Sequence, residues 1–380
     1  MIPRTLFDSD LEGFRDTVRK FLEKEATPFH AQWEKDGQVS REVWDKAGEM
    51  GFLCPTAGES YGGLGCDFRY SAVVMEEVAR SGCSGLGWPL HSDIVMPYLN
   101  NWGSEALKQK YIPKLISGEM IGAIAMTEPG AGSDLQAIKT TAIKQGDHYV
   151  LNGSKTFITN GQMADMVIVV AKTDPSEGAK GISLLLVEAN SEGFVKGSNL
   201  DKVGMKAQDT SELFFTDVKV PAENLIGKEG IGFMALMQEL PQERLLVALT
   251  AMAACEAAIE WTKDYIKERK AFGKPICKFQ NTRFKMAEII GETTALRVFT
   301  DRCLELHLSK KLDIPTAAML KQLTTDLQCK VMDECVQLHG GYGYMTEYPI
   351  ARAWADSRVQ KIYAGTNEIM KEIVARAELG

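Results

Sequence analysis

The hydrophobic period changes twice along this chain of 380 residues, and this change restricts the possible folds more than any other feature. From residue 8 to about 119, apolar residues such as Leu11, Phe14 and Val18 recur at three- and four-residue spacing, which is typical of amphipathic helices. From about 120 to 225 the period falls to two, and afterwards it is helical again. Because strands and helices are not interleaved, the order argues against a doubly wound sheet.

The middle and C-terminal regions carry more specific signals. Short β-prone runs in the middle are divided by Gln-Gly-Asp, Asn-Gly and Asp-Pro turns, which favours antiparallel strands. Long helices are predicted over 242–270, 280–308, 314–338 and 366–378. We therefore expect an α+β chain with an all-helical domain over 1–119, a central antiparallel β-barrel or sandwich over 120–228 and a C-terminal four-helix bundle over 229–380.

Charge and cysteine usage exclude several classes of function. The net charge of −8 argues against nucleic acid as a main partner, because binding phosphates needs a basic surface. The eight cysteines never form a C-x-x-C pair, so we expect reduced thiols and no metal site. The longest largely apolar run has 11 residues, which predicts a protein that is not integral to a membrane. The N-terminus has no signal or transit character, so we expect a bacterial cytoplasmic protein.

Four stretches could carry a ligand, although each also has a simple structural explanation. AMTEPGAGSD (125–134) and FITNG (157–161) end strands and contain turn residues, but small residues also let backbone N–H groups approach an anion or a planar ring. ERKAFGKPICKFQ (268–280) and QLHGGYGY (337–344) are typical of helix C-caps, or of bare backbone that a ligand or another chain can approach.

Taken together and in this order, these stretches and YAGTNEI (363–369) resemble the acyl-CoA dehydrogenase family over essentially the whole chain, and its long-chain members most. The resemblance implies a homotetrameric enzyme that uses FAD to desaturate an acyl-CoA thioester between Cα and Cβ. It also implies electron-transfer flavoprotein as the electron acceptor.

The resemblance also assigns residues to the cofactor and the substrate. It places Met126, Thr127, Phe157, Ile158 and Thr159 around the flavin ring. It also assigns Gly132 to the cofactor and places Ser133 near the ligand and cofactor phosphates. It assigns the FAD of a neighbouring subunit to Arg269, Phe272, Gln280, Gln337, Gly340 and Gly341. Thr366, Asn367 and Glu368 would meet the FAD, and Arg244, Ala364 and Gly365 would meet the substrate.

The catalytic base is not where many members of the family carry it. Their carboxylate stands at the position of Ala364, where this chain has a methyl group. In the stretch MQELPQERLLVALTAM (237–252), Pro241 predicts a helix start, which places Glu243 in a first helical turn. The helix dipole alone favours an acidic residue at a helix N-terminus, so this position by itself does not indicate a catalytic role. However, long-chain and isovaleryl members of the family carry the base on this helix and a small residue in the turn, so we predict Glu243 as the base.

Three points stay open at this stage. Burial should raise the pKa of Glu243, while the helix end and Arg244 should lower it. Ala251, Ala254 and Ala258 could leave room for a long or branched acyl chain, or could simply allow close helix packing. The competing carboxylate is Glu368, and the rival functions are an acyl-CoA oxidase, a flavin monooxygenase and a non-catalytic acyl-CoA or flavin-binding protein.

Overall fold

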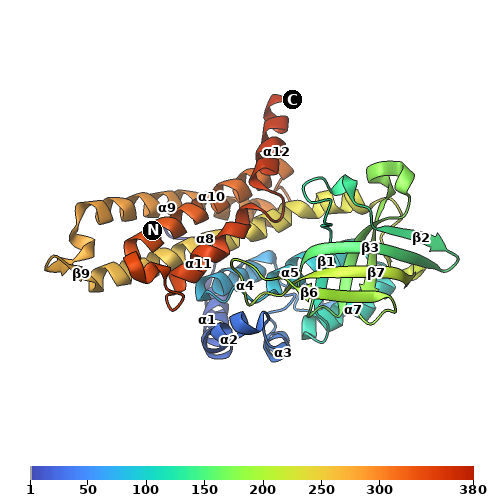
Figure 1. The fold of residues 1–380 in the computed structure, drawn as a ribbon, viewed down its shortest axis with the longest axis horizontal. Coiled ribbons are helices and arrows are strands. Elements are labelled where there is room, and N and C mark those ends of the chain that lie inside the picture. The colour runs from blue at the N-terminus through green and yellow to red at the C-terminus, as the bar shows by residue number, and fades with distance from the viewer. Residues whose placement is uncertain (1) are drawn as a thin grey trace.

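In the computed structural model, which describes residues 2–380, helices occupy both ends of the chain and strands the middle (Figure 1). This order confirms the predicted fold class. Asp8 begins the first helix, because its carboxylate accepts a hydrogen bond from the Leu11 N–H at 3.0 Å. The N-terminal helices are α1 (Ser9–Glu25), α2 (Thr27–Asp36), α3 (Arg41–Glu49), α4 (Phe68–Ser81), α5 (Trp88–Leu90), α6 (Met96–Trp102) and α7 (Glu105–Ser117).

The middle of the chain forms an eight-stranded sheet in the order β6-β7-β3-β2-β4-β5-β8, with β1 beside β4. It is antiparallel except for the contacts of β4 with β1 and, at one residue pair, with β2. The strands β4 and β5 are buried on both faces, which explains their nearly continuous apolar runs. The strands are β1 (Gly122–Ala125), β2 (Thr141–Gln145), β3 (His148–Thr159), β4 (Met166–Lys172), β5 (Ile182–Glu188), β6 (Phe194–Asn199), β7 (Thr210–Pro221) and β8 (Leu225–Ile226).

Long helices pack lengthwise in the C-terminal part, and a short hairpin joins the first two of them (Figure 1). The last helix projects away from the body of the molecule. All eight cysteines are free thiols, as expected. The C-terminal elements are α8 (Gly232–Glu268), β9 (Lys270–Ala271), β10 (Lys274–Pro275), α9 (Gln280–Leu308), α10 (Ile314–His339), α11 (Pro349–Ser357) and α12 (Asn367–Leu379).

The start of α8 differs from the prediction, which placed it at Pro241. The helix begins at Gly232, and Pro241 lies inside it. Ala235 and Leu236 are buried against the core that includes β4 and β5, and this burial offsets the backbone hydrogen bond that proline removes. Glu243 is therefore in the interior of the helix, and the expected influence of a helix end on its pKa was wrong.

Helix α8 is long and apolar enough to cross a membrane, judged by length and composition alone. Of its most apolar window, 78% is buried inside the protein. Its position between α4, α9 and α10 explains the burial, because these helices cover most of its apolar residues. We therefore interpret it as the core helix of the bundle.

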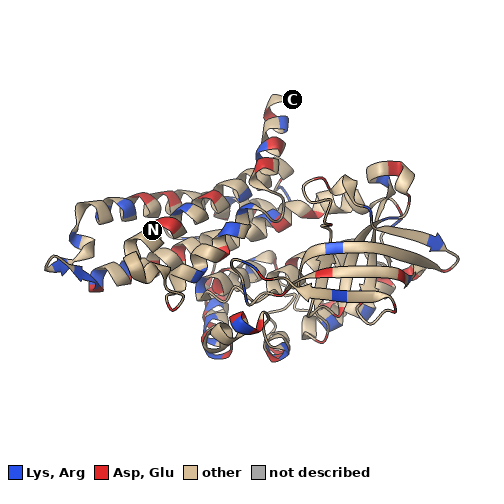
Figure 2. Cartoon of the chain, viewed as in Figure 1, with Lys and Arg blue, Asp and Glu red and all other residues tan. Residues whose placement is uncertain are grey.

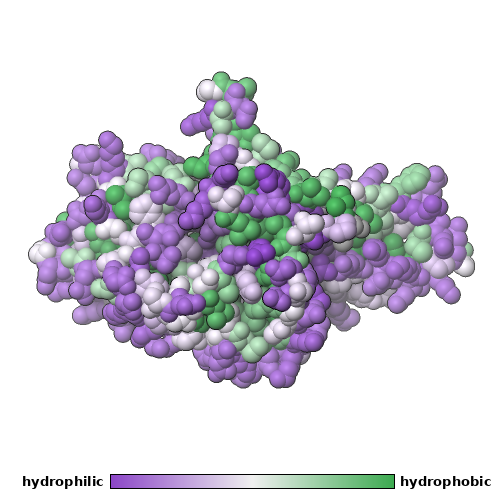
Figure 3. Space-filling model, turned by 180° about the vertical axis from the view of Figure 1, so that it is seen from behind, coloured by the Kyte–Doolittle hydropathy of each residue, from purple (hydrophilic) through white to green (hydrophobic). Residues whose placement is uncertain are grey.

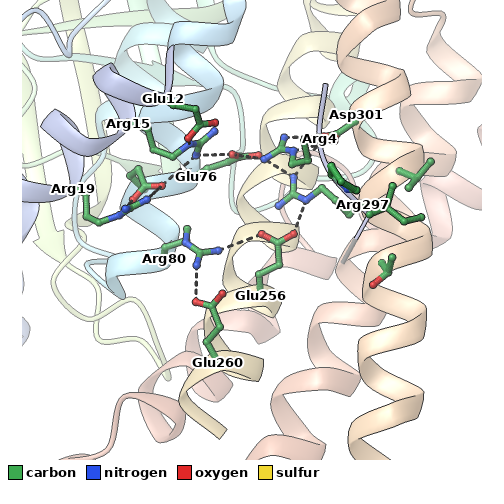
Figure 4. A pocket seen from close by; sticks show the side chains of 15 residues that line it. Arg4, Glu12, Arg15, Arg19, Glu76, Arg80, Glu256, Glu260, Arg297 and Asp301 are labelled. Atoms are coloured by element: carbon green, nitrogen blue, oxygen red, sulfur yellow. Dashed lines mark hydrogen bonds and ion pairs between the residues drawn. The ribbon is translucent and has the colours of Figure 1, made fainter. Parts of the chain in front are cut away.

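Charged side chains form a buried network between α1, α4, α8 and α9 (Figure 4). The Glu76 carboxylate on α4 accepts hydrogen bonds from Arg4 at 2.8 Å, Arg15 at 2.9 Å and Arg297 at 2.8 Å. Arg297 also donates to Glu256 on α8 at 2.7 Å. We call these five residues the Glu76 network. It joins the N-terminal helices to the bundle through charge rather than apolar contact.

Candidate active site

A cavity of about 290 Å³ lies where the N-terminal helices, the sheet and the bundle meet. The ends of β1 and β3 form one wall, α4 another, and α8, α10 and α11 complete it. Seen from behind, apolar surface gathers in the middle of the molecule, near the base of the projecting α12 (Figure 3). The predicted site residues that line this cavity are Met126, Thr127, Phe157, Ile158, Thr159, Glu243 and Ala364.

A buried lysine positions the loop that follows β1. Lys155 is fully buried in β3, and its ammonium group donates to the Met126 carbonyl at 2.9 Å and to the Glu128 carboxylate at 2.8 Å. The Thr156 N–H also donates to the Thr127 carbonyl at 2.9 Å. Lys155 was not among the residues predicted from the sequence. The only signal was a charged residue in the middle of a strand, two residues before Phe157.

The exposed ring of Phe157 stands at a bulge in β3. The pairing of β3 with β7 shifts between Lys155 and Ile158, and Phe157 takes a φ of 60°, which is unfavourable for an aromatic residue. Phe157 lines the cavity and is 67% exposed. Backbone strain of this kind concentrates at functional sites, and an uncovered aromatic ring suits a planar aromatic ligand.

Glu243 projects from the interior of α8 and is only 4% exposed. Its carboxylate accepts a hydrogen bond from the Tyr98 hydroxyl at 2.8 Å. Burial raises the pKa of Glu243 to about 7, and the charge of Glu239 adds to this effect, while Tyr98 and Arg244 act against it. Burial thus wins the competition that the sequence left open, and Glu243 can exchange a proton near neutral pH.

Three side-chain contacts hold α6 and the preceding π-helical turn (His91–Val95) against α8. The Gln242 amide donates to the Asp93 carbonyl at 2.7 Å, Tyr98 donates to Glu243, and Trp102 donates to Glu239 at 2.8 Å. We call these contacts the α6–α8 ladder. It fixes the direction of the Glu243 carboxylate. Sequence reasoning missed Tyr98, because nothing in its local sequence links it to a residue so distant in the chain.

The turn that contains Ala364 is held from the bundle side. The Lys321 ammonium donates to the Gly365 carbonyl at 2.8 Å and to the Asn367 side chain at 3.0 Å. Ala364 and Gly365 take φ angles of 52° and 89°, so this turn is in the left-handed region. The turn thus keeps this backbone conformation with only a methyl group as the side chain of residue 364.

Arg244 is buried next to the candidate base, yet it is poorly satisfied. Within residues 2–380, its Nε and Nη1 atoms have no hydrogen-bond partner. Burial lowers the pKa of Arg244, and the neighbouring Glu243 counteracts this effect. Buried donors without acceptors cost free energy. Arg244 does not line the cavity, so its predicted contact with the substrate stays a prediction.

A second group of predicted residues lies at the opposite end of the bundle, near β9 (Figure 1). Arg269, Gln337, Gly340 and Gly341 line an open groove there. Phe272, at the tip of the β9–β10 hairpin, is 95% exposed. Basic residues cluster at this hairpin (Figure 2). One chain therefore does not bring the two groups of predicted cofactor residues together.

The remaining predicted residues lie outside both sites. Gly132 and Ser133 are exposed in the loop after β1, and Gln280 begins α9. Thr366 caps α12, where its hydroxyl accepts from the Ile369 N–H at 3.3 Å. The Asn367 side chain is buried in bonds to α10. Glu368, the competing carboxylate, is exposed and does not line the cavity.

Comparison with known proteins follows the same division of the chain. The acyl-CoA dehydrogenase N-terminal, middle and C-terminal domain families match residues 8–119, 123–218 and 230–379. The mitochondrial long-chain specific acyl-CoA dehydrogenase of Mus musculus is 55% identical over 375 residues, which cover 98% of this chain and 87% of the mouse protein.

Solved structures agree with this comparison. An acyl-CoA dehydrogenase from Geobacillus kaustophilus has a TM-score of 0.98 and 51% identity, and the match covers 100% of both chains. An acyl-CoA dehydrogenase from Bacillus anthracis, solved in complex with FAD, has a TM-score of 0.92 and 31% identity over 98% of this chain and 68% of that one. By sequence and by fold, this chain belongs to the acyl-CoA dehydrogenase family.

Proposed function

We propose that the protein dehydrogenates long-chain acyl-CoA thioesters to trans-2-enoyl-CoA with FAD as cofactor and Glu243 as the base. The observation that carries this proposal is the position of Glu243. The carboxylate is buried, is fixed by Tyr98, and lines the same cavity as Ala364, where related enzymes carry their own carboxylate. A carboxyl group with a pKa near neutrality is suited to accept a proton at physiological pH.

The residues at the sheet end of the cavity fit FAD. The uncovered ring of Phe157, together with Met126, Thr127 and Thr159, would hold the flavin, and the Ala364–Thr366 turn would meet it from the bundle side. When bound, FAD supplies the acceptor for the hydride that leaves Cβ.

The protein's own residues would perform the proton chemistry. Glu243 would remove the α-proton, and Tyr98 would keep its carboxylate directed into the cavity. The Ala364 N–H, which does not depend on the side chain at that position, would donate to the thioester oxygen as negative charge develops there. Leu246 and Val247, which line the cavity one turn beyond Glu243, would exclude water from the α-carbon.

The cavity has room for a long acyl chain. Along α8 it is lined from Glu243 to Trp261, two residues about 27 Å apart along the helix axis. A lipid bilayer, whose core contains two layers of acyl chains, is about 30 Å thick, so this distance exceeds the length of one such chain. At the far end, a Cβ added to Gly82 would lie 3.7 Å from the Trp261 ring. Ala254 lines the cavity, whereas Ala251 and Ala258 are buried in helix packing.

We further propose a homotetramer that passes electrons to electron-transfer flavoprotein. The separation of the two groups of predicted cofactor residues within one chain supports such an assembly. The groove at Arg269, Gln337 and Gly341 lies at the other end of the bundle from the cavity, so it would serve a cofactor held by a second copy of the chain. The exposed Phe272 and the basic hairpin suit a contact with that cofactor's phosphates and rings.

An anaerobic titration with saturated acyl-CoA thioesters of increasing length tests the proposal. We expect bleaching of the flavin absorbance by long straight chains and weaker bleaching by short or α-branched ones. A flavoprotein that binds these thioesters without bleaching would contradict the assignment of a dehydrogenase. Comparing oxygen consumption with reduction of an artificial acceptor separates a dehydrogenase from an oxidase.

Replacing Tyr98 with phenylalanine should change the pH dependence of the reaction. The Tyr98 hydroxyl favours the charged form of Glu243, so its loss should raise the pKa of that carboxyl further. The acid limb of kcat/KM should move to higher pH, and a lower rate above this limb would report the lost positioning of the carboxylate. An acid limb that stays at the same pH would contradict the electrostatic role of Tyr98.

A further inference from the structure

The middle of the acyl cavity contains an amide without a partner. Gln328 on α10 lines the cavity and is only 3% exposed. Within the described part of the chain, its Oε1 atom accepts no hydrogen bond. A buried amide normally has partners, because leaving its donors and acceptors unpaired costs free energy. The mechanism proposed above gives Gln328 no role.

Two contacts between helices place Gln328 along the cavity. At the end near the base, Lys321 on α10 donates to the Gly365 carbonyl at 2.8 Å. At the far end, the Tyr265 hydroxyl on α8 donates to the His339 carbonyl on α10 at 3.0 Å. Gln328 lies between these levels, about two helical turns beyond Lys321. It therefore faces the middle of a long acyl chain rather than the thioester or the chain end.

A hydroxyl group lines the same stretch of the cavity from α8. Thr250 lies about 10 Å beyond Glu243 along the helix axis. Across residues 2–380 its hydroxyl forms no hydrogen bond with the protein. Two other threonines of the bundle, Thr262 and Thr324, each donate to the carbonyl one turn earlier, at 2.7 and 2.8 Å. The Thr250 hydroxyl is thus free to meet a ligand.

On α4, α8 and α10 the wall around these two polar groups is apolar, and it is formed by Met75, Val78, Leu246, Val247, Ala254 and Met332. Polar side chains elsewhere in the lining, such as Arg352, Asp356 and Gln360, form no hydrogen bond with Gln328 or Thr250 within residues 2–380. A saturated acyl chain would leave both groups unpaired. A hydroxyl on the chain could accept from the Gln328 amide nitrogen and donate to its oxygen, because a hydroxyl is both donor and acceptor.

We propose that Gln328 and Thr250 form a polar subsite for long-chain acyl-CoA thioesters that carry a hydroxyl group near the middle of the chain. This inference rests on the proposed function and deepens it. It makes Gln328 a specificity residue, remote from the reacting carbons. A preceding reaction that adds water across an in-chain double bond, or that hydroxylates the chain, would supply such substrates.

The test compares octadecanoyl-CoA with its mid-chain and ω-hydroxy derivatives in the wild-type holoenzyme, Gln328→Met and the control Met332→Leu. We expect the wild type to favour the mid-chain over the ω-hydroxy substrate by about tenfold in kcat/KM, which is the effect of one to two hydrogen bonds. Gln328→Met should abolish this preference, Thr250→Val should reduce it, and Met332→Leu should retain it.

Two further measurements separate the possible failures. Turnover of hexanoyl-CoA, which is too short to reach Gln328, should be equal in all variants. Affinities for unreactive thioether analogues of the same acyl chains, measured by calorimetry, test the subsite independently of turnover. If no thioester is oxidised, the dehydrogenase function is refuted, and the affinities still test the subsite. An unchanged preference in Gln328→Met overturns the proposal. A second result would also overturn it: the wild type shows no preference for the mid-chain hydroxyl, and Gln328→Met gains activity on octadecanoyl-CoA. This result would indicate that Gln328 binds a trapped water molecule instead.

Discussion

Replacing Glu243 with glutamine should reduce the rate of substrate-dependent flavin bleaching by about 10²–10⁴-fold, the range attributed to a positioned general base. The change is nearly isosteric, and the amide oxygen can still accept the hydrogen bond from Tyr98. The amide cannot take up the α-proton, however. Stopped-flow mixing under anaerobic conditions measures this rate, and the flavin spectrum of the resting enzyme shows whether the cofactor is retained.

Glu368→Gln is the matched control, because Glu368 is the other carboxylate close to the Ala364 turn. It is exposed and outside the cavity, so this variant should bleach at close to the wild-type rate. Normal bleaching in Glu243→Gln, or a severe loss in a Glu368→Gln enzyme that retains its flavin, would mean that the base has been assigned to the wrong side chain.

Introducing glutamate at position 364 into the Glu243→Gln enzyme should restore part of the activity. Ala364 lines the same cavity as Glu243, and its left-handed backbone is already maintained with a side chain present. The α-proton requires only that a carboxylate reach it, from either backbone position. No recovery, in a variant that folds and binds flavin, would show that the two positions are not interchangeable here.

The second large effect concerns stability. Replacing Glu76 with alanine should lower the free energy of unfolding by about 3–5 kcal/mol, because it leaves buried arginines without their counter-charge. Glu76 is buried and accepts from Arg4, Arg15 and Arg297 at once. Glu12→Gln is the control, since Glu12 lines the same region but pairs with Arg15 at the surface. Thermal midpoints of both variants, measured with flavin bound, give the comparison.

The same network predicts loss of stability in acid. Burial alone would raise the pKa of Glu76, but the charges of Arg297, Arg4 and Arg15 outweigh it and hold the pKa well below its usual range. A carboxylate with a depressed folded-state pKa stabilises the protein above its unfolded-state pKa, and this contribution is lost as the pH falls. The difference in thermal midpoint between wild type and Glu76→Ala should therefore shrink below about pH 4. A constant difference down to pH 2 would contradict this account.

Local patterns predicted most of the fold. Helix α9 begins and ends where the sequence predicted, because turn residues separate it from both neighbours. Pro241 misled the prediction of α8, because burial of Ala235 and Leu236 against the sheet core outweighs the local preference of proline. Local sequence signals reveal the separate elements. They do not reveal where a tertiary contact overrides a local preference and moves the boundary of an element.

The site was only partly predictable, and for a different reason. Glu243 could be found because a motif surrounds it and because Ala364 occupies the usual position of the base. Tyr98, Lys155 and Gln328 have no motif, and their roles arise from contacts with residues far along the chain. The raised pKa of Glu243 likewise depends on burial, which composition does not report.

The α6–α8 ladder limits how this enzyme can be recombined with its relatives. Its two sides lie in different domains, since Tyr98 falls in the stretch matched as the N-terminal domain and Glu243 in the stretch matched as the C-terminal domain. A chimera that takes one of these domains from a relative with its carboxylate in the turn could keep every helix and strand. It would nevertheless have either a carboxylate at position 243 without its hydroxyl partner, or a hydroxyl at position 98 without its carboxylate. A functional chimera therefore has to take the residues at positions 98, 243 and 364 from the same parent protein.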